Sequence, residues 1–396
     1  MKPGLETIRA VCRALGDPQD GIKTIHVAGT NGKGCVCAVL DAALRAAGMR
    51  TGRYTSPHLV KLNERFFLDG APVRDELLQK YAARVQHLLA DRAGRPEFAE
   101  VTYFEALTAV AFLLYGDVKP DFTILETGLG GRLDATNICS PAVSVITRIG
   151  LDHCDWLGGT IGAIAAEKAG IIKPGVPVVL GRNTPEAIAV VKRRAEEAGA
   201  PFHYAPDVFD ESQVPRDFSL DGSFNRENAA TAAAALAVLK LPVAGFGNVV
   251  WPGRFQRVGR FIVDGAHNPP AARALAAALD PSASYTLVAG FCSDKDVDET
   301  LRILRPHVSR AIAVKTCNPR SLSPGELSRK MAAAGIASRP CGSLREALQS
   351  MEPWQGPGPD ALVCGSLFLA GEALAELGAY PWQTGAFDPA EALRPA

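Results

Sequence analysis

The sequence has no excess of either charge and no long apolar run. Its 42 lysines and arginines equal its 42 aspartates and glutamates, so no bulk electrostatic field favours nucleic acid or an anionic membrane. No apolar run is long enough to cross a bilayer, and the N-terminal residues carry no apolar signal segment. These absences predict a cytoplasmic protein that has neither a membrane nor a nucleic acid as a partner.

The nine cysteines form no C-x-x-C pair and no Cys/His grouping at zinc spacing. Cys35 and Cys37 are the only close pair, but alternate positions on a helix do not face each other. We therefore expect free thiols in a reducing compartment. Internal repeats, low-complexity tracts and nucleic-acid motifs are also lacking.

Residues 24–56 predict a strand, a glycine-rich loop, a helix and a second strand. The loop, residues 29–34, reads G-T-N-G-K-G, and it aims backbone N–H groups at an anion while Lys33 adds a positive charge for phosphates. It departs from G-x-x-x-x-G-K-[ST], because Val27 takes the place of the first glycine and Cys35 that of the hydroxyl residue. A tight turn with a surface lysine is the alternative to nucleotide binding.

Other candidate residues follow predicted strands, at the edge where open α/β sheets bind ligands. The strand 122–125 leads to Glu126, and the strand 143–147 leads to His153. A single histidine at a strand end is more often structural than a ligand, but the shared edge makes a common site reasonable. Near the end of a helix predicted over residues 160–172 stands Lys168, where a lysine normally caps helix carbonyls.

The length of 396 residues exceeds what one hydrophobic core usually serves, so two domains are expected. The turn-rich stretch 245–259 interrupts the pattern, and alternating strands and helices restart after it. We predict an α/β protein in which residues 1–253 form a P-loop-containing ATP-binding domain with a mainly parallel sheet. Residues 254–396 are expected to form a smaller Rossmann-like domain.

The G-T-N-G-K-G loop resembles the ATP loop of the Mur ligase superfamily, and points to its folylpolyglutamate synthase and dihydrofolate synthase branch. Further motifs match this branch in the same order, over most of the chain. They are E-T-G-L-G-G-R-L-D-A-T-N at 126–137, L-D-H at 151–153, E-K-A-G-I at 167–171, W-P-G-R at 251–254, D-G-A-H-N-P at 264–269 and G-S-L-F-L at 365–369.

The resemblance implies roles for particular residues. The ATP-binding residues would be Gly29, Thr30, Asn31, Gly32, Lys33, Gly34, Cys35, Asn228, Arg254 and Asp264. The Mg²⁺ ligands would be Ser56, Glu126, His153 and a carbamylated Lys168. Substrate contacts would come from Thr102, Asp134, Ala135, His267 and Ser366, and the catalytic groups would be Lys33, Lys168, Arg254 and His267.

Some of these positions have a second interpretation. Thr102 is also an adequate N-cap for the helix that follows it. Asn225 and Asn228 share a helix face from which a base edge can be read, and the resemblance selects Asn228. Phe368 replaces the tyrosine found in part of the family, which weakens any claim for a hydroxyl contact there.

The implied reaction is ATP-driven amide formation, in which a carboxylate becomes an acyl phosphate that glutamate attacks. The expected substrates are dihydropteroate or tetrahydrofolate and L-glutamate, with ATP, two Mg²⁺ ions and, as an open question, a monovalent cation. A monomer is expected. Because the chemistry depends on positioning and charge, no Ser/His/Asp or Cys/His arrangement is required.

Two alternatives remain at this stage. A Mur-type amino-acid ligase would need an additional N-terminal uridine-binding domain, whereas only about two dozen residues precede the loop strand. A nucleotide-binding module without ligase activity would have little use for a second metal, which Glu126, His153 and Lys168 together imply.

Overall fold

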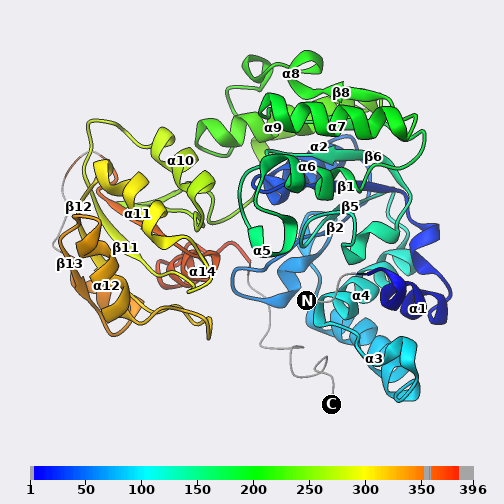
Figure 1. The fold of residues 1–396 in the computed structure, drawn as a ribbon, viewed down its shortest axis with the longest axis horizontal. Coiled ribbons are helices and arrows are strands. Elements are labelled where there is room, and N and C mark those ends of the chain that lie inside the picture. Colours follow the sequence, from blue (N-terminus) through cyan, green and yellow to red (C-terminus); the bar gives the residue numbers. More distant parts are fainter. Residues whose placement is uncertain (1–3, 352–355, 357, 383–396) are drawn as a thin grey trace.

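The computed structural model describes residues 4–351, 356 and 358–382, and these form two separate β-sheets with helices on both faces (Figure 1). The first sheet has eight strands in the order β4-β3-β2-β5-β1-β6-β7-β8, and the second has six in the order β13-β12-β11-β14-β10-β9. The predicted α/β class is confirmed. The predicted domains also include residues 1–3, 352–355, 357 and 383–396, which lie outside the described residues, and the boundary at 253/254 stays a prediction.

The first sheet is parallel except at one edge, where β3 pairs antiparallel with both β2 and β4. Its central strand β1 is buried along its whole length between β5 and β6, as its apolar sequence predicts. The strands are β1 (Thr24–Ala28), β2 (Thr51–Tyr54), β3 (Phe66–Leu68), β4 (Ala71–Pro72), β5 (Phe122–Glu126), β6 (Pro141–Ile146), β7 (Val178–Leu180) and β8 (Phe202–Tyr204).

Helices cover both faces of this sheet because alternate residues of its strands point to opposite sides. Ile25 and Val27 of β1 pack with α2 (Lys33–Ala46) and α9 (Ser223–Val238). The opposite face carries the other helices in two clusters. The first cluster contains α1 (Glu6–Ala14), α3 (Asp75–Asp91) and α4 (Tyr103–Val118). The second cluster contains α5 (Cys154–Leu157), α6 (Ile161–Ala169) and α7 (Pro185–Glu197). The short α8 (Ala205–Val208) packs against α9.

The second sheet is parallel in its interior, and β9 joins its edge antiparallel to β10. The strands are β9 (Gln256–Val258), β10 (Phe261–Val263), β11 (Tyr285–Ala289), β12 (Val308–Ala313), β13 (Ser338–Pro340) and β14 (Ala361–Cys364). One face packs against α10 (Pro269–Ala278), α11 (Val297–Leu304) and α12 (Pro324–Ala333), and the other against α13 (Leu344–Gln349) and α14 (Leu367–Glu376).

The observed elements correct some predicted boundaries. The helix predicted over 160–172 ends at Ala169, where Gly170 packs closely against Arg132 of another segment. The strand predicted over 51–56 ends at Tyr54, three residues before Pro57. In the described part of the chain, no helix is long and apolar enough to span a membrane. All nine cysteines are free, as predicted.

A buried charge network joins α2 to the adjacent strand β2. Arg53 and Asp41 are each 2% exposed, and their side chains approach to 3.6 Å. Thr51 donates its hydroxyl to Asp41 at 2.5 Å, and the Arg53 guanidinium lies 3.8 Å from the centre of the Phe67 ring. Removing one partner of such a pair leaves an uncompensated buried charge.

We expect Arg53→Leu to lower the free energy of unfolding by about 3 kcal/mol, because Asp41 would lose its buried partner and keep only the partly exposed Arg45, 3.4 Å away, as a cation. Urea unfolding followed by circular dichroism measures the loss. Arg84→Ala is the matched control, since Arg84 and Asp117 form an exposed ion pair at 2.7 Å that should contribute less than about 1 kcal/mol. Equal losses in the two variants would contradict the assignment.

Candidate functional site

The candidate site is centred on the loop between β1 and α2. Gly29 and Gly32 have positive φ angles of 153° and 89°, and Gly32 precedes the first turn of α2. Thr30 is fixed by its backbone N–H, which donates to the Arg148 carbonyl at 2.9 Å. The positive end of the α2 dipole therefore lies beside a loop whose shape is imposed by its neighbours, which is an arrangement suited to a phosphate.

Each glycine of this loop lies against a side chain from a different element. A Cβ at Gly29 would lie 1.8 Å from the Thr147 hydroxyl, and a Cβ at Gly32 would lie 2.2 Å from the Asn228 side chain. A Cβ at Gly34 would lie 2.2 Å from the Trp251 indole. No residue larger than glycine fits at these three positions without a clash. The G-x-x-G-x-G spacing is therefore required by packing as well as by the backbone conformation of the loop.

Lys33 faces Glu126, which ends β5. Their charged atoms are 4.0 Å apart, and Glu126 is 4% exposed. The Ser56 backbone N–H donates to Glu126 at 3.2 Å. Burial raises the pKa of Glu126, while Lys33 and Ser56 oppose this shift. This carboxylate thus lies in a poorly solvated position where an additional positive charge would stabilise its ionised form.

Lys168 enters the same site from α6, with 3% of its surface exposed. It does not cap its own helix, which is the ordinary role for a lysine so placed; instead its Nζ donates to the Gly29 carbonyl at 2.8 Å. The Lys33 Nζ donates to the same carbonyl at 3.2 Å. Burial and the charge of Lys33 lower the pKa of Lys168 to about 7, so much of this amine is neutral near neutral pH.

The predicted metal ligands suit a hard cation only in part. Glu126 offers the buried oxygen that Mg²⁺ prefers, and Ser56 lies beside it. His153 has a side chain 40% exposed, and burial lowers its pKa, which favours the neutral imidazole that binds metals. Among residues 4–351, 356 and 358–382, no three His, Cys, Asp or Glu side chains gather closely enough to hold a metal ion. A second cation would need further oxygens, such as those of a carbamylated Lys168.

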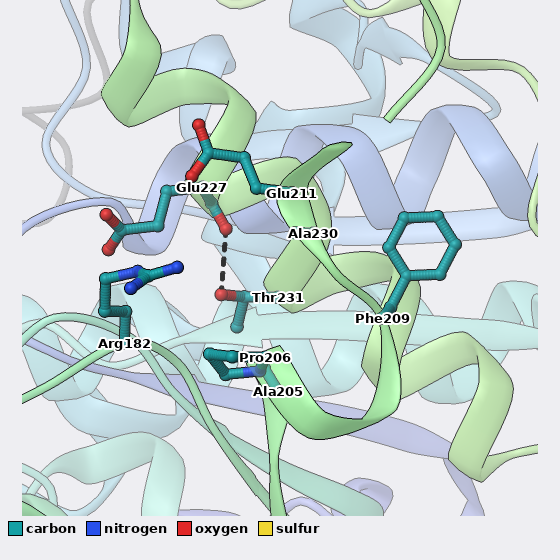
Figure 2. Close-up of a pocket in the computed structure, with 8 residues that line it drawn as sticks. All are labelled: Arg182, Ala205, Pro206, Phe209, Glu211, Glu227, Ala230 and Thr231. Carbon is teal, nitrogen blue, oxygen red and sulfur yellow. Dashed lines mark hydrogen bonds between the residues drawn. The ribbon is translucent and has the colours of Figure 1, made fainter. Parts of the chain in front are cut away.

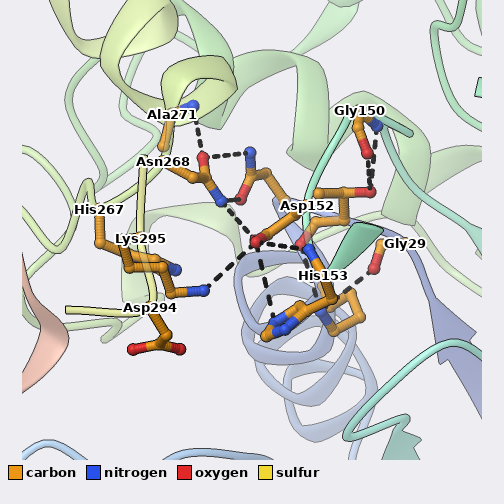
Figure 3. Close-up of polar contacts among 12 residues, drawn as sticks. Gly29, Gly150, Asp152, His153, His267, Asn268, Ala271, Asp294 and Lys295 are labelled. Carbon is orange, nitrogen blue, oxygen red and sulfur yellow. Dashed lines mark hydrogen bonds and ion pairs between the residues drawn. The ribbon is translucent and has the colours of Figure 1, made fainter. Parts of the chain in front are cut away.

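Polar side chains of both sheets meet beside this loop (Figure 3). Lys295, which follows β11, forms an ion pair with Asp152 at 3.2 Å, and both side chains are 13% exposed. Asn268 donates to Asp152 at 2.7 Å. Asn31 of the loop donates to Asn268 at 3.3 Å. These four side chains, which we call the junction cluster, connect the glycine-rich loop directly to the second sheet.

Asp152 carries the negative charge of the junction cluster. Burial acts against its ionisation, but Lys295, His153, His267 and the hydrogen bond from Asn268 outweigh burial and lower the pKa of Asp152 to about 2. The carboxylate is therefore ionised at any physiological pH. It neutralises Lys295 at the point where the two sheets approach each other.

Arg254 lies in the segment that connects the two sheets, and Asp264 directly follows β10 of the second sheet. Arg254 donates to the Gly253 carbonyl at 3.0 Å, and burial lowers its pKa against the opposing charges of Asp264 and Glu126. Asp264, 5% exposed, accepts hydrogen bonds from the backbone N–H groups of Phe255 and Ala266, each at 2.7 Å. In this structure Asp264 fixes the backbone that carries Arg254.

His267 and Ser366 lie on adjacent loops of the second sheet. The His267 Nδ1 hydrogen-bonds with the Gly265 carbonyl at 2.8 Å, and burial together with Lys295 lowers its pKa to about 4. Ser366 caps α14 by accepting a hydrogen bond from the Phe368 backbone N–H. The two loops are joined because Gly365 donates its N–H to the Ala266 carbonyl at 2.8 Å.

The predicted folate-contacting residues make structural contacts of their own. Thr102 caps α4 in a reciprocal arrangement with Glu105, so its N-cap interpretation is confirmed. Asp134 is 4% exposed and accepts hydrogen bonds from the Thr136 hydroxyl and the Leu129 backbone N–H. Ala135 is buried and begins the short 3₁₀ helix Ala135–Ile138. The Asp134 carboxylate therefore organises its loop.

Of the two predicted asparagines, Asn228 faces the glycine-rich loop. It lies against Gly32 and hydrogen-bonds with the buried Cys35 thiol, whose pKa is raised to about 12 by burial. Asn225 is buried and donates to the Asp221 carbonyl at 2.6 Å, so its amide is used at the start of its own helix.

A small cavity beside α9 is not a nucleotide site. Its volume is about 10 Å³, enough for roughly one water molecule. Figure 2 shows the Thr231 hydroxyl donating to the Glu227 carbonyl, at 3.0 Å, next to this space. The lining residues are Arg182, Ala205, Pro206, Phe209, Glu211, Glu227, Ala230 and Thr231.

Sequence reasoning did not identify Lys295, Asp152 or Trp251 as parts of the site. A signal was available for the first two, because each follows a strand of a mainly parallel sheet at its carboxyl edge. Trp251 belongs to the W-P-G-R motif at 251–254, but its contact with Gly34 joins segments 217 positions apart, which the motif does not reveal.

The family described as "Mur ligase, glutamate ligase domain" matches residues 253–367. A dihydrofolate synthase/folylpolyglutamate synthase of Bacillus subtilis is 38% identical over 311 residues, which cover 70% of this chain and 72% of that protein.

Solved structures agree over nearly the whole chain. A Mycobacterium tuberculosis folylpolyglutamate synthase complexed with ADP and AMPPCP has a TM-score of 0.87 at 31% identity, with 96% of each chain covered. A bifunctional folylpolyglutamate synthase/dihydrofolate synthase of Yersinia pestis, complexed with AMPPNP and a Mn ion, has a TM-score of 0.81 at 33% identity. The match covers 96% of this chain and 94% of that one.

We expect Lys295→Met to loosen the contact between the two sheets, because Asp152 would lose its cationic partner. In a double-mutant cycle with Asp152→Asn, the pair should show a coupling energy of about 1–2 kcal/mol in thermal unfolding. Small-angle scattering should report a larger radius of gyration for Lys295→Met than for the parent protein.

Lys330→Met is the control for this experiment, since Lys330 pairs with Asp298 at 2.9 Å within the second sheet's own helices and does not reach the first sheet. An unchanged radius of gyration in Lys295→Met, or an equal increase in Lys330→Met, would show that the junction cluster does not hold the sheets together.

Proposed function

Because this chain belongs to the folylpolyglutamate synthase/dihydrofolate synthase family of Mur ligases, we propose that it is an ATP-dependent amide ligase. It adds L-glutamate to the carboxylate of a folate or of dihydropteroate. The observation that carries this function is the convergence of Lys33, Glu126 and Lys168 on the Gly29–Gly34 loop, beside side chains of the second sheet. Charged side chains from both sheets thus lie around one loop of the kind that binds phosphates.

The reaction has two steps. The substrate carboxylate attacks the γ-phosphorus of ATP, which forms an acyl phosphate and releases ADP. The amine of glutamate then attacks the acyl carbon, loses a proton, and expels inorganic phosphate as the amide forms. Negative charge develops on the transferring phosphoryl group in the first step and on the acyl oxygen in the second, so fixed positive groups stabilise both.

The nucleotide is proposed to lie along the loop and the start of α2. Backbone N–H groups of residues 29–35 would bind its phosphates, and Lys33 would neutralise the β- and γ-phosphates. Arg254, whose positive charge interacts with both Glu126 and Cys35, would approach from the connection between the sheets. Asn228 would contact the base. Asp264 would contact ATP and would also hold the backbone next to Arg254, through the hydrogen bond that it accepts from Phe255.

The metal sites are proposed at Ser56, Glu126, His153 and Lys168. Two Mg²⁺ ions would supply charge neutralisation for the phosphates, and a monovalent cation is an additional candidate. Lys168 would bind the second ion as a carbamate, whose formation begins with a neutral amine. The lowered pKa of Lys168, about 7, supports this modification because the amine is then partly deprotonated.

The two organic substrates are proposed to bind on opposite sides of the phosphate. Thr102, Asp134 and Ala135, from α4 and the loop after β5, would line the folate side. His267 and Ser366, from the second sheet, would receive glutamate. His267 is neutral because its pKa is about 4, so it can hydrogen-bond with the amine or accept a proton from it. We also propose that the protein is monomeric and that its domains divide at residues 253/254.

Incubation with ATP, Mg²⁺, glutamate and, in parallel, dihydropteroate or tetrahydrofolate should give products that are heavier by one or more glutamate residues. Mass spectrometry of the products, combined with a coupled ADP assay, makes the measurement. The Lys33→Met variant should lose at least about 100-fold in kcat, since a fixed charge on the transferring phosphate is removed. ADP release that needs neither acceptor nor glutamate would contradict the ligase assignment.

Carbamylation of Lys168 should increase as pH rises through about 7, because only the neutral amine reacts with CO₂. We expect Lys168→Ala to lower kcat by about 100-fold or more, and acetate or another small carboxylate to restore part of it. Carbon-13 NMR in labelled bicarbonate should detect a carbamate in the parent protein and lose it in the variant.

The control for the labelling experiment is Lys192→Ala, which removes an exposed lysine of α7. It should keep both the carbamate signal and the rate. A Lys168→Ala variant with an unaltered rate would exclude the proposed second metal role.

A further inference from the structure

A histidine inside the central strand has no place in the mechanism above. His26 lies in the middle of β1 with 0% of its surface exposed, between β5 and β6. Burial and Lys173 lower its pKa to about 3, so the imidazole is neutral. Its Nδ1 has no hydrogen-bond partner, and a polar ring in such a position needs a reason.

The other ring nitrogen contacts the loop after β5. The His26 Nε2 lies 2.8 Å from the Thr136 hydroxyl oxygen. The Thr136 hydroxyl donates to the Asp134 carboxylate at 2.6 Å, because an ionised carboxylate can only accept. The Thr136 oxygen therefore accepts from His26, which fixes the tautomer with its proton on Nε2. A relay of His26, Thr136 and Asp134 thus runs from the sheet interior to the loop.

Asp134 passes this constraint to the rest of the loop. It accepts hydrogen bonds from the backbone N–H groups of Leu129 at 2.8 Å and Thr136 at 3.0 Å, so both ends of the loop are tied to one carboxylate. The Asp134 carboxylate, which the relay holds, is therefore one of the groups that fix this loop. Others are the backbone N–H of Arg132, which donates to the Glu167 carbonyl at 2.8 Å, and the Asn137 amide, which donates to the Gly170 carbonyl at 3.1 Å.

The same loop touches the elements on each side of it. A Cβ at Gly128 would lie 2.5 Å from the Phe104 ring, near the start of α4. A Cβ at Gly131 would lie 2.9 Å from the Lys168 carbonyl, near the end of α6. The loop is thus packed between the helix that begins at Thr102 and the helix that carries Lys168, with little space to adjust.

We propose that His26 is a positioning residue for the folate or pteroate substrate, which acts through Thr136 and Asp134 to set the place of residues 128–137. The assignment rests on the proposed function, because it takes this loop as the folate-binding side of the site. His26 itself touches no substrate. From within β1, its Nε2–H reaches the Thr136 side chain, which itself donates to Asp134.

The test compares His26→Leu, which removes the donor, with His26→Gln, whose amide nitrogen reaches about as far as Nε2. For His26→Leu we expect the KM for dihydropteroate or tetrahydrofolate to rise about tenfold, the usual scale for one buried hydrogen bond, while the KM values for ATP and glutamate stay within about twofold. His26→Gln should restore most of the affinity.

Two further variants complete the design. Thr136→Val should reproduce the rise in KM, and the double variant with His26→Leu should add little to either single change. Thr123→Val is the matched control: Thr123 is fully buried on the adjacent strand β5, and its hydroxyl has no partner, so the KM for the folate substrate should not change.

Several outcomes would overturn the proposal. One is a parallel rise in all three KM values, and another is a lower thermal midpoint for His26→Leu with every KM unchanged. A third is failure of His26→Gln to improve on His26→Leu when both are folded. If the parent protein adds glutamate to no folate at all, the proposed function is wrong. That result differs from the three above, which contradict only the role of His26.

Discussion

The structure depends on holding several positive charges close to one another with little water. Lys33 and Lys168 both donate to the Gly29 carbonyl, Arg254 lies in the segment that connects the sheets, and Lys295 approaches from the second sheet. Their mutual repulsion is balanced within the protein by Glu126 and Asp152. An anionic phosphate is the natural complement of this arrangement, because fixed charges in a poorly solvated site favour a ligand of opposite sign. Burial, together with the nearby charge of Lys33, lowers the pKa of Lys168 in this site.

The two sheets contribute to the site in different ways. The first sheet supplies the loop, the carboxylate of Glu126 and the buried amine of Lys168 from three separate elements. The second sheet reaches this group through Lys295 and Asn268, which both contact Asp152. Trp251 adds an apolar contact, because its indole lies directly on Gly34. The arrangement explains why the glycines of the loop cannot be exchanged, as each accommodates a neighbour from elsewhere in the chain.

Much of this could be predicted from the sequence, where the signal is local. The strand–loop–helix pattern, the α/β class and the position of Glu126 follow from residue type and spacing, whereas Lys168 is a candidate only through the resemblance of its E-K-A-G-I motif to the family. The partners of these residues do not. Lys168 caps no helix but donates to Gly29, 139 positions away, and Asp152 pairs with Lys295, 143 positions away. Such contacts arise from chain topology and packing, which hydrophobic periodicity does not encode. Likewise, Asp134 and Asp264 were recognisable as motif residues, whereas their bonds to backbone N–H groups required the folded geometry.

The ion pair between Asp152 and Lys295 has a consequence for the speed of the enzyme. An acyl phosphate is destroyed by water, so the sheets must stay together until the amide has formed. Separation of the sheets would open the site for release of ADP and the lengthened product, and such motions often limit turnover in enzymes that sequester their intermediates. A stronger bridge would delay release, and a weaker one would waste ATP through hydrolysis. The strength of the contact between the sheets, to which this ion pair contributes, would therefore be bounded on both sides by the catalytic cycle.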